Sequence, residues 1–87
     1  MSEASPSWYV YILRCVDSSL YTGVTTDTER RVKEHNQSDR LGAKYTRYRR
    51  PVSLVYREPC KNRSAACKRE AEIKKLSRQT KIKLIGT

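Results

Sequence analysis

Two side chains that can bind a phosphate stand four residues apart near the middle of the chain. Arg31 and His35 lie in a segment predicted to be helical from about residue 28 to 36, and positions i and i+4 are neighbours on one helix face. At about 100° per residue, both lie on the same side of Val32, the one firmly apolar residue of the segment. A guanidinium and an imidazole placed in this way can act on one phosphate. A lone histidine is more often a packing residue, and that alternative stays open.

A carboxylate falls on the apolar stripe of a second predicted helix, which starts at residue 62 or 64 and ends near 76. At about 100° per residue, Glu70 lies about +40° from Ala66, in the middle of the stripe that runs from Leu76 to Cys67, whereas Glu72 lies among solvated cations. An inward carboxylate is costly unless a cation or a metal ion compensates its charge. We therefore expect either a Lys or Arg partner or a metal ion at Glu70.

Two tyrosines are predicted to share one face of a β-hairpin. Trp8 to Arg14 and Leu20 to Val24 are rich in aromatic and β-branched residues, with turn formers between them. Any register that pairs odd positions with odd positions puts Tyr11 and Tyr21 on the same side. The two phenols either pack as aromatic rings or present hydroxyl groups that need partners. Gly23 predicts a bulge or a close approach to the backbone.

The remaining segments predict a small α+β domain. A short segment of undefined structure covers residues 43–50, a third strand starts at Val52 and ends near Pro59, and a last helix covers residues 77–85. Three strands with two or three substantial helices favour a small three-stranded, mainly antiparallel sheet flanked by helices. We expect residues 1–7 to be a disordered lead and residues 8–87 to form a single domain.

The net excess of positive charge lies entirely in the second half of the chain. The 87 residues carry a formal net charge of +10, but residues 1–43 hold five basic and six acidic side chains and residues 44–87 hold fourteen and three. This asymmetry favours a polyanion binder, because Lys and Arg that neutralise phosphates release condensed counterions. A soluble basic protein is the alternative. A membrane surface is disfavoured, since the basic helices lack an apolar aromatic face.

Composition excludes several other classes. No apolar run approaches the roughly 20 residues that span a bilayer, and no signal peptide is evident, so we expect a cytoplasmic protein. Three cysteines and a single histidine are too few soft ligands for a closed zinc site. We expect free thiols, with Cys15 and Cys67 as small core residues and Cys60 in a loop.

Taken in order, these residues resemble the GIY-YIG endonuclease superfamily, and in particular its small, stand-alone, largely uncharacterised bacterial members. The resemblance covers residue 8 to about 85. It rests on Tyr9-Val10-Tyr11, Tyr21-Thr22-Gly23, Arg31-x-x-x-His35, the stretch Gly42-Ala43-Lys44-Tyr45-Thr46 before Pro51-Val52, and Glu70 followed by Ile73-Lys74.

The resemblance implies roles for five side chains in metal-dependent phosphodiester hydrolysis, with Mg²⁺ or Mn²⁺ as the cofactor. Glu70 corresponds to the metal-binding glutamate, and Arg31 to the arginine that holds the scissile phosphate. Tyr11 and Tyr21 correspond to tyrosines that orient or deprotonate the attacking water, and His35 to a hydrogen-bonding or proton-relay partner of one of them. Which tyrosine is the base stays open.

We therefore expect an endonuclease or structure-selective nuclease that acts on DNA with low sequence specificity, in a role such as DNA repair. A monomer without a small-molecule cofactor is expected. The alternatives are a catalytically silent nucleic-acid-binding module and, less favoured, a domain that docks on an acidic protein. The expected nucleic-acid contacts are Lys44, Arg47, Arg49 and Arg50.

Overall fold

A computed structural model describes residues 7–86 of the chain. In this part the strands β1 (Trp8–Arg14), β2 (Leu20–Thr25) and β3 (Ser53–Cys60) form one sheet in the order β2-β1-β3, with both pairings antiparallel. The predicted α+β fold and its three-stranded antiparallel sheet are confirmed. The expected disordered lead falls, apart from Ser7, outside the described residues.

Within residues 7–86, four helices flank the sheet: α1 (Thr28–Gln37), α2 (Lys44–Arg47), α3 (Arg63–Lys74) and α4 (Arg78–Ile85). Side chains cap the starts of α1, α3 and α4, whereas no side chain caps α2. The Asp27 carboxylate accepts the backbone N–H of Arg30 before α1, and the Asn62 side chain accepts that of Ala65 before α3. Across the described residues, no helix has the length and apolarity needed to cross a membrane.

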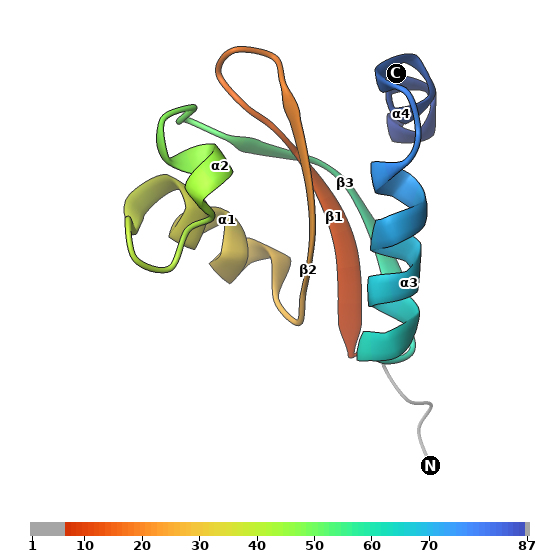
Figure 1. Ribbon diagram of the computed structural model, residues 1–87. Coiled ribbons are helices and arrows are strands. Elements are labelled where there is room, and N and C mark those ends of the chain that lie inside the picture. The colour runs from red at the N-terminus through yellow and green to blue at the C-terminus, as the bar shows by residue number, and fades with distance from the viewer. Residues whose placement is uncertain (1–6, 87) are drawn as a thin grey trace.

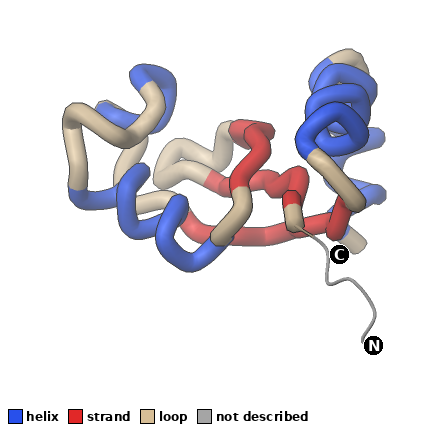
Figure 2. The backbone as a smooth tube through the Cα atoms, turned by 90° about the horizontal axis from the view of Figure 1, so that it is seen from below, coloured by secondary structure: helices blue, strands red, loops and turns tan. Residues whose placement is uncertain are grey.

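The central position of β1 explains why this strand carries the core. Because side chains alternate along a strand, Val10 and Ile12 pack with Ile73 of α3 on one face, and Tyr11 and Leu13 form a second cluster on the other. Figure 1 shows α1 and α2 on one side of the sheet and α3 and α4 on the other, and Figure 2 shows the same separation from below.

The hairpin register places the two tyrosines as predicted. Tyr11 pairs with Gly23 and Leu13 pairs with Tyr21, so odd positions face odd positions. Gly23 allows a close approach, because a Cβ added there would lie 2.5 Å from the Tyr11 hydroxyl oxygen. The approaching group is therefore the tyrosine of the adjacent strand. The sheet's irregularity lies elsewhere, between Ile12 and Leu13 in the pairing of β1 with β3.

The expected core position of Cys67 is wrong, because this residue is exposed. Helix α3 meets the sheet along a narrow ridge through Ala66 and Ile73, both fully buried. A residue one position after Ala66 is rotated by about 100° from that ridge and so reaches solvent. Cys15 is buried as expected, whereas Cys60 is the half-buried last residue of β3 rather than a loop residue. All three are free thiols.

Candidate active site

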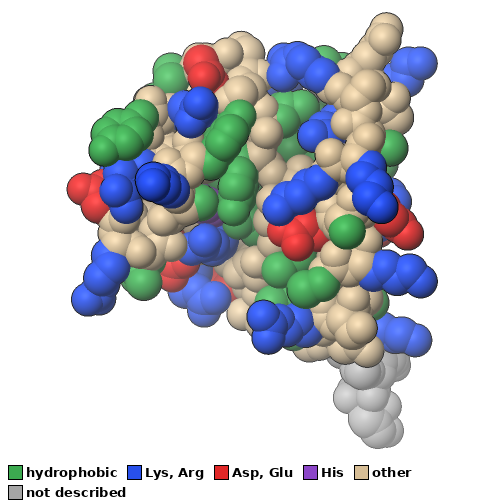
Figure 3. Space-filling view, viewed as in Figure 1, with side chains coloured by type: hydrophobic (Ala, Val, Ile, Leu, Met, Phe, Trp, Pro, Cys, Tyr) green, Lys and Arg blue, Asp and Glu red, His purple; other side chains and the backbone are tan. Residues whose placement is uncertain are grey.

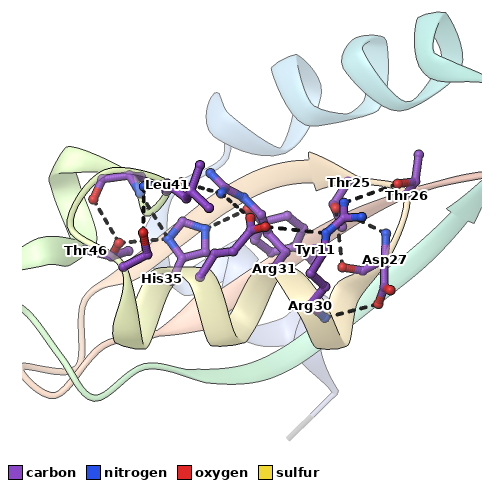
Figure 4. A network of polar contacts seen from close by, with 12 residues as sticks. Tyr11, Thr25, Thr26, Asp27, Arg30, Arg31, His35, Leu41 and Thr46 are labelled. Carbon is purple, nitrogen blue, oxygen red and sulfur yellow. Dashed lines mark hydrogen bonds and ion pairs between the residues drawn. The ribbon is translucent and has the colours of Figure 1, made fainter.

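A chain of hydrogen bonds links β1, α1 and α2 at the centre of the site. The Tyr11 hydroxyl lies 2.9 Å from His35 Nε2, and His35 Nδ1 lies 2.8 Å from Thr46 Oγ1. All three side chains are at most 1% exposed. Figure 4 shows His35 between Tyr11 and Thr46, with Arg31 on the same helix beside Tyr11. The structure thus gives His35 a partner on each ring nitrogen.

The contacts of Thr46 assign the tautomer of His35. The single hydroxyl hydrogen of Thr46 is donated to the Ala43 carbonyl at 3.0 Å, so Thr46 Oγ1 accepts the hydrogen of His35 Nδ1. Nε2 then carries no hydrogen and accepts that of the Tyr11 hydroxyl. The Ala43 N–H also points at Nδ1, but at 3.4 Å this is the longest contact of the group, and we assign the tautomer from the shorter ones.

The His35 imidazole is neutral at neutral pH and so can act as a base. Burial and the neighbouring Arg31 and Arg50 cations lower its pKa from 6.5 to about 4, against the opposing charge of Glu34. A neutral imidazole is the state that accepts a proton. His35 can therefore take a proton from Tyr11 at neutral pH, provided that a new negative charge arrives to stabilise the imidazolium.

The Tyr11 phenol is neutral in the same conditions. Burial raises its pKa from 10.0 to about 12, and Arg31 opposes this rise, while the charges of Tyr21 and Glu70 add to it. Tyr11 thus responds to three of the other four side chains that the sequence singled out. His35 contacts Tyr11 and Tyr21 directly and Arg31 lies beside Tyr11, whereas Glu70 of α3 influences Tyr11 through its charge.

Arg31 is a cation with one end fixed. Its Nη1 donates to Glu34 Oε1 at 2.8 Å and to the Leu41 carbonyl at 2.6 Å. Burial lowers its pKa, but the contacts with Glu34 and Tyr11 outweigh burial, so the pKa is raised overall. Nη1 is held by Glu34 and Leu41 and the guanidinium also contacts Tyr11, so the other N–H groups of Arg31 can serve a phosphate.

Tyr21 joins the site through its ring. The ring centroid lies 5.3 Å from that of His35 and 5.7 Å from that of Tyr45, on which Tyr21 stacks. The Arg49 guanidinium lies 4.2 Å from the Tyr45 ring centroid, so a cation covers the end of this aromatic row. The two alternatives for the tyrosine pair are ring packing and hydrogen bonding, and each applies to one residue. The Tyr21 ring packs on Tyr45, and the Tyr11 hydroxyl forms a hydrogen bond with His35.

Glu70 is half-buried, with 22% of its side chain exposed, and its Oε2 lies 3.2 Å from Lys74 Nζ. Residues 7–86 contain no group of three His, Cys, Asp or Glu side chains that could hold a metal alone. One carboxylate nevertheless fits Mg²⁺, which keeps several waters and is commonly bound by one or two carboxylates and the substrate phosphate. The donor set thus fits a metal site that the substrate completes.

Three of the arginines predicted to contact nucleic acid are bonded to the protein itself. Arg47 donates to the Asp39 carbonyl at 2.6 Å, and Arg49 donates to the Tyr45 carbonyl and pairs with Asp17. Arg50 donates to the carbonyls of His35 and Ser38 and pairs with Asp39. These contacts fasten the segment between α1 and α2 and so hold Thr46 against His35. Lys44, the fourth residue of the set, is exposed.

Sequence reasoning assigned no individual role to Thr46, Tyr45 or Glu34. Helix α2 has only four residues, so no periodicity distinguishes its buried side from its exposed side. The one available signal for Thr46 is its place in the stretch 42–46 that carried part of the resemblance.

The fold and the arrangement of these side chains define the class of protein. Residues 7–83 match the family described as the GIY-YIG catalytic domain. The chain belongs to this family of endonucleases, as the sequence pattern predicted.

Similar proteins of comparable size are named only as members of family UPF0213. The UPF0213 protein of Desulfotalea psychrophila is 58% identical over 80 residues, which cover 92% of this chain and 72% of that protein. The one from Staphylococcus saprophyticus is 56% identical over 78 residues, covering 90% of this chain and 93% of the other. These names assign no reaction.

Two solution NMR structures share the fold. The UPF0213 protein of Bacillus halodurans is 47% identical, with a TM-score of 0.57 over 90% of this chain and 81% of that chain. A protein from E. faecalis is 45% identical, with a TM-score of 0.58 over 95% of this chain and 85% of that chain.

Proposed function

We propose that this protein is a metal-dependent nuclease that hydrolyses phosphodiester bonds in DNA with low sequence specificity. The observation that carries the proposal is the buried Tyr11–His35–Thr46 chain beside Arg31. Hydrolysis needs a proton acceptor for water and a cation for the phosphate, and this site offers both.

In the proposed reaction Tyr11 passes a proton to His35. A water oxygen attacks the phosphorus while one water proton moves to the Tyr11 oxygen and the Tyr11 proton moves to His35 Nε2. The bond from phosphorus to the leaving oxygen breaks, and that oxygen takes a proton from solvent. Arg31 binds the phosphate through its remaining donors, and Thr46 keeps the imidazolium oriented through Nδ1–H.

We assign the proton transfer to Tyr11 rather than Tyr21 because only the Tyr11 hydroxyl has a proton acceptor within the described residues. Tyr21 then holds the His35 ring through an edge-to-face contact.

The transfer is unfavourable in the free protein. The pKa of Tyr11 is about 12 and that of His35 about 4, a gap of about eight pH units, equivalent to on the order of 10 kcal/mol. Two changes on substrate binding reduce this gap. The phosphate's negative charge stabilises the imidazolium, and a divalent ion held by Glu70 would stabilise the negative charge that develops on the Tyr11 oxygen. The free site is therefore inactive, and it becomes competent when substrate and cation are both bound.

Glu70 is the proposed metal ligand. A divalent ion there supplies Lewis acidity for a phosphate oxygen and lowers the pKa of a bound water. Glu70 contributes its carboxylate after exchange of the Lys74 partner, whose side chain is 52% exposed, so the ion pair is easily displaced.

The experiment is cleavage of nicked, flapped and duplex DNA with Mg²⁺ or Mn²⁺ by the wild type, Arg31→Ala and Glu70→Ala, with binding measured in parallel. We expect cleavage by the wild type and a loss of at least about 100-fold in both variants. Wild-type protein that binds these DNAs and cuts none of them would contradict the proposal.

A catalytically silent nucleic-acid-binding module is the second candidate, because Lys74 already neutralises the one carboxylate of the site. It predicts salt-sensitive DNA binding without cleavage, and binding that does not change in Glu70→Ala.

A further inference from the structure

A pocket lies between the hairpin turn, α2 and α4, outside the group of catalytic side chains. Its volume is about 200 Å³, and it is lined by Ser19, Leu20, Tyr45, Arg78 and Lys81. Tyr45 belongs at once to this pocket and to the aromatic row, because it stacks on Tyr21. The pocket and the candidate active site are therefore linked through the Tyr45 side chain.

The pocket has the electrostatic character of an anion site. Arg78 and Lys81 are three residues apart on α4 and so share one face of the helix. Neither cation forms an ion pair with any residue from 7 to 86, in contrast to Arg49 and Arg50, which follow α2 and line no part of the pocket. The lining contains no acidic residue.

The Asp17 carboxylate of the hairpin turn already has hydrogen-bond and ion-pair partners. Asp17 accepts from the Ser19 hydroxyl at 2.6 Å and pairs with Arg49 at 3.2 Å. These bonds lower the pKa of Asp17, the Ser19 contacts first, so the group stays ionised with its charge matched by Arg49. The two cations of α4 thus face the pocket without a neutralising partner.

The size of the pocket limits what it can hold. Sites for whole small-molecule ligands usually measure about 300 to 1,000 Å³, so a space of about 200 Å³ suits a single phosphate with part of its sugar. Figure 3 shows Lys and Arg side chains on both sides of this face, over α1 and α2 and over α3 and α4, with hydrophobic side chains between them.

We propose that this pocket binds a backbone phosphate of the DNA strand further along from the scissile phosphate, held by Arg78 and Lys81. The proposal rests on the proposed nuclease function and adds a second contact to it. A strand that lies across the Tyr21–Tyr45 row then reaches Arg31 at one end and α4 at the other. Helix α4 becomes part of the substrate site as well as a cover for the sheet.

The test is binding of a short fluorescein-labelled single-stranded DNA, with EDTA present so that no cleavage occurs. The double variant Arg78→Gln/Lys81→Gln is compared with Lys68→Gln/Lys83→Gln, which removes the same charge from exposed positions outside the pocket. We expect the pocket variant to lose about tenfold or more in affinity, with a salt slope shallower by about 0.7 per lost phosphate. The control is expected to stay within about threefold of wild type.

Equal losses in the two double variants would overturn the proposal, because they would reflect net charge alone. A second measurement avoids any effect of substitution on folding. Amide NMR signals of wild-type protein titrated with the unlabelled strand are expected to shift at Ser19, Leu20 and Lys81. Shifts confined to the region of Arg31 and His35 would contradict the pocket while leaving the nuclease proposal intact. A wild type that binds no DNA at all contradicts both.

Discussion

The Tyr11 hydroxyl lies 2.9 Å from His35 Nε2, although the two residues are 24 positions apart and belong to a strand and a helix. This buried bond joins a phenol of high pKa to an imidazole of low pKa. Its position depends on Gly23 beneath the ring, on Thr46 behind the imidazole and on the arginines that hold α2. Each of these supports can be tested separately.

Replacing Gly23 tests the close approach. In Gly23→Ala the new Cβ meets the Tyr11 hydroxyl oxygen at 2.5 Å, so the ring has to move and its bond to His35 is strained. We expect a loss of about 1 to 3 kcal/mol in the free energy of unfolding and a large loss of cleavage.

The matched control is Gly86→Ala. Gly86 has a left-handed φ of 86° and nothing within 4 Å of an added Cβ, so this substitution costs stability through the backbone alone, by about 1 kcal/mol. Its cleavage activity should match the wild type. Equal activities of the two alanine variants would show that Gly23 has no special relation to the site.

The depressed pKa of His35 makes stability depend on pH. Between about pH 6.5 and pH 4 the unfolded chain binds a proton at this residue and the folded protein does not, so stability falls as the pH falls through this window. The shift corresponds to at most about 3 kcal/mol. Denaturant unfolding of wild type and His35→Gln at a series of pH values isolates this contribution, because the chain has one histidine. Parallel pH curves for the two proteins would disprove the assigned pKa.

Thr46 is predicted to be a positioning residue. Thr46→Val keeps the shape but leaves His35 Nδ1–H unpaired in the interior, which costs about 1 to 3 kcal/mol of stability and at least about tenfold in cleavage rate. Thr46→Ser retains the hydroxyl and should recover most of both. The nitrogen chemical shifts of His35 are expected to report the Nδ1–H tautomer in wild type and Thr46→Ser. A tautomer unchanged in Thr46→Val, with normal cleavage, would rule out this role.

Lys74 competes with a metal ion for Glu70. Removing the ammonium group in Lys74→Gln frees the carboxylate from a partly exposed pair worth about 0.2 to 1 kcal/mol. We therefore expect the Mg²⁺ concentration for half-maximal cleavage to fall by up to about fivefold. Lys75→Gln, which removes the same charge from an exposed neighbour, is the control. A requirement for more Mg²⁺ in Lys74→Gln would mean that Lys74 assists the site.

The sequence predicted the parts of the site that lie on regular elements. Strand alternation placed Tyr11 and Tyr21 on one face, and helical spacing placed Arg31 beside His35. Glu70 lies on the predicted stripe of α3 but is only half-buried, because it reaches the solvent edge where Lys74 meets it. Periodicity predicts on which face of a helix a residue lies, but it does not predict how deeply the side chain is buried.

What the sequence missed depends on contacts between distant segments. Thr46 is buried because Arg47 and Arg50, a few residues after it, bond to carbonyls of α1 and of the loop that follows α1, and no local pattern encodes those bonds. The same bonds occupy Arg47, Arg49 and Arg50, which composition alone assigned to DNA. Their contact with nucleic acid stays a prediction, whereas Arg78 and Lys81 of α4 form no ion pair with any residue in the described range 7–86.

The central claim is that the Tyr11 oxygen takes part in proton transfer, and Tyr11→Phe tests it most directly. Phenylalanine keeps the ring over Gly23 and removes one atom. Cleavage of labelled DNA in a single turnover with Mg²⁺, together with DNA binding in EDTA, is compared between this variant and the wild type. We predict a rate at least about 100-fold lower with binding within about twofold. Wild-type cleavage rates in Tyr11→Phe would contradict the account.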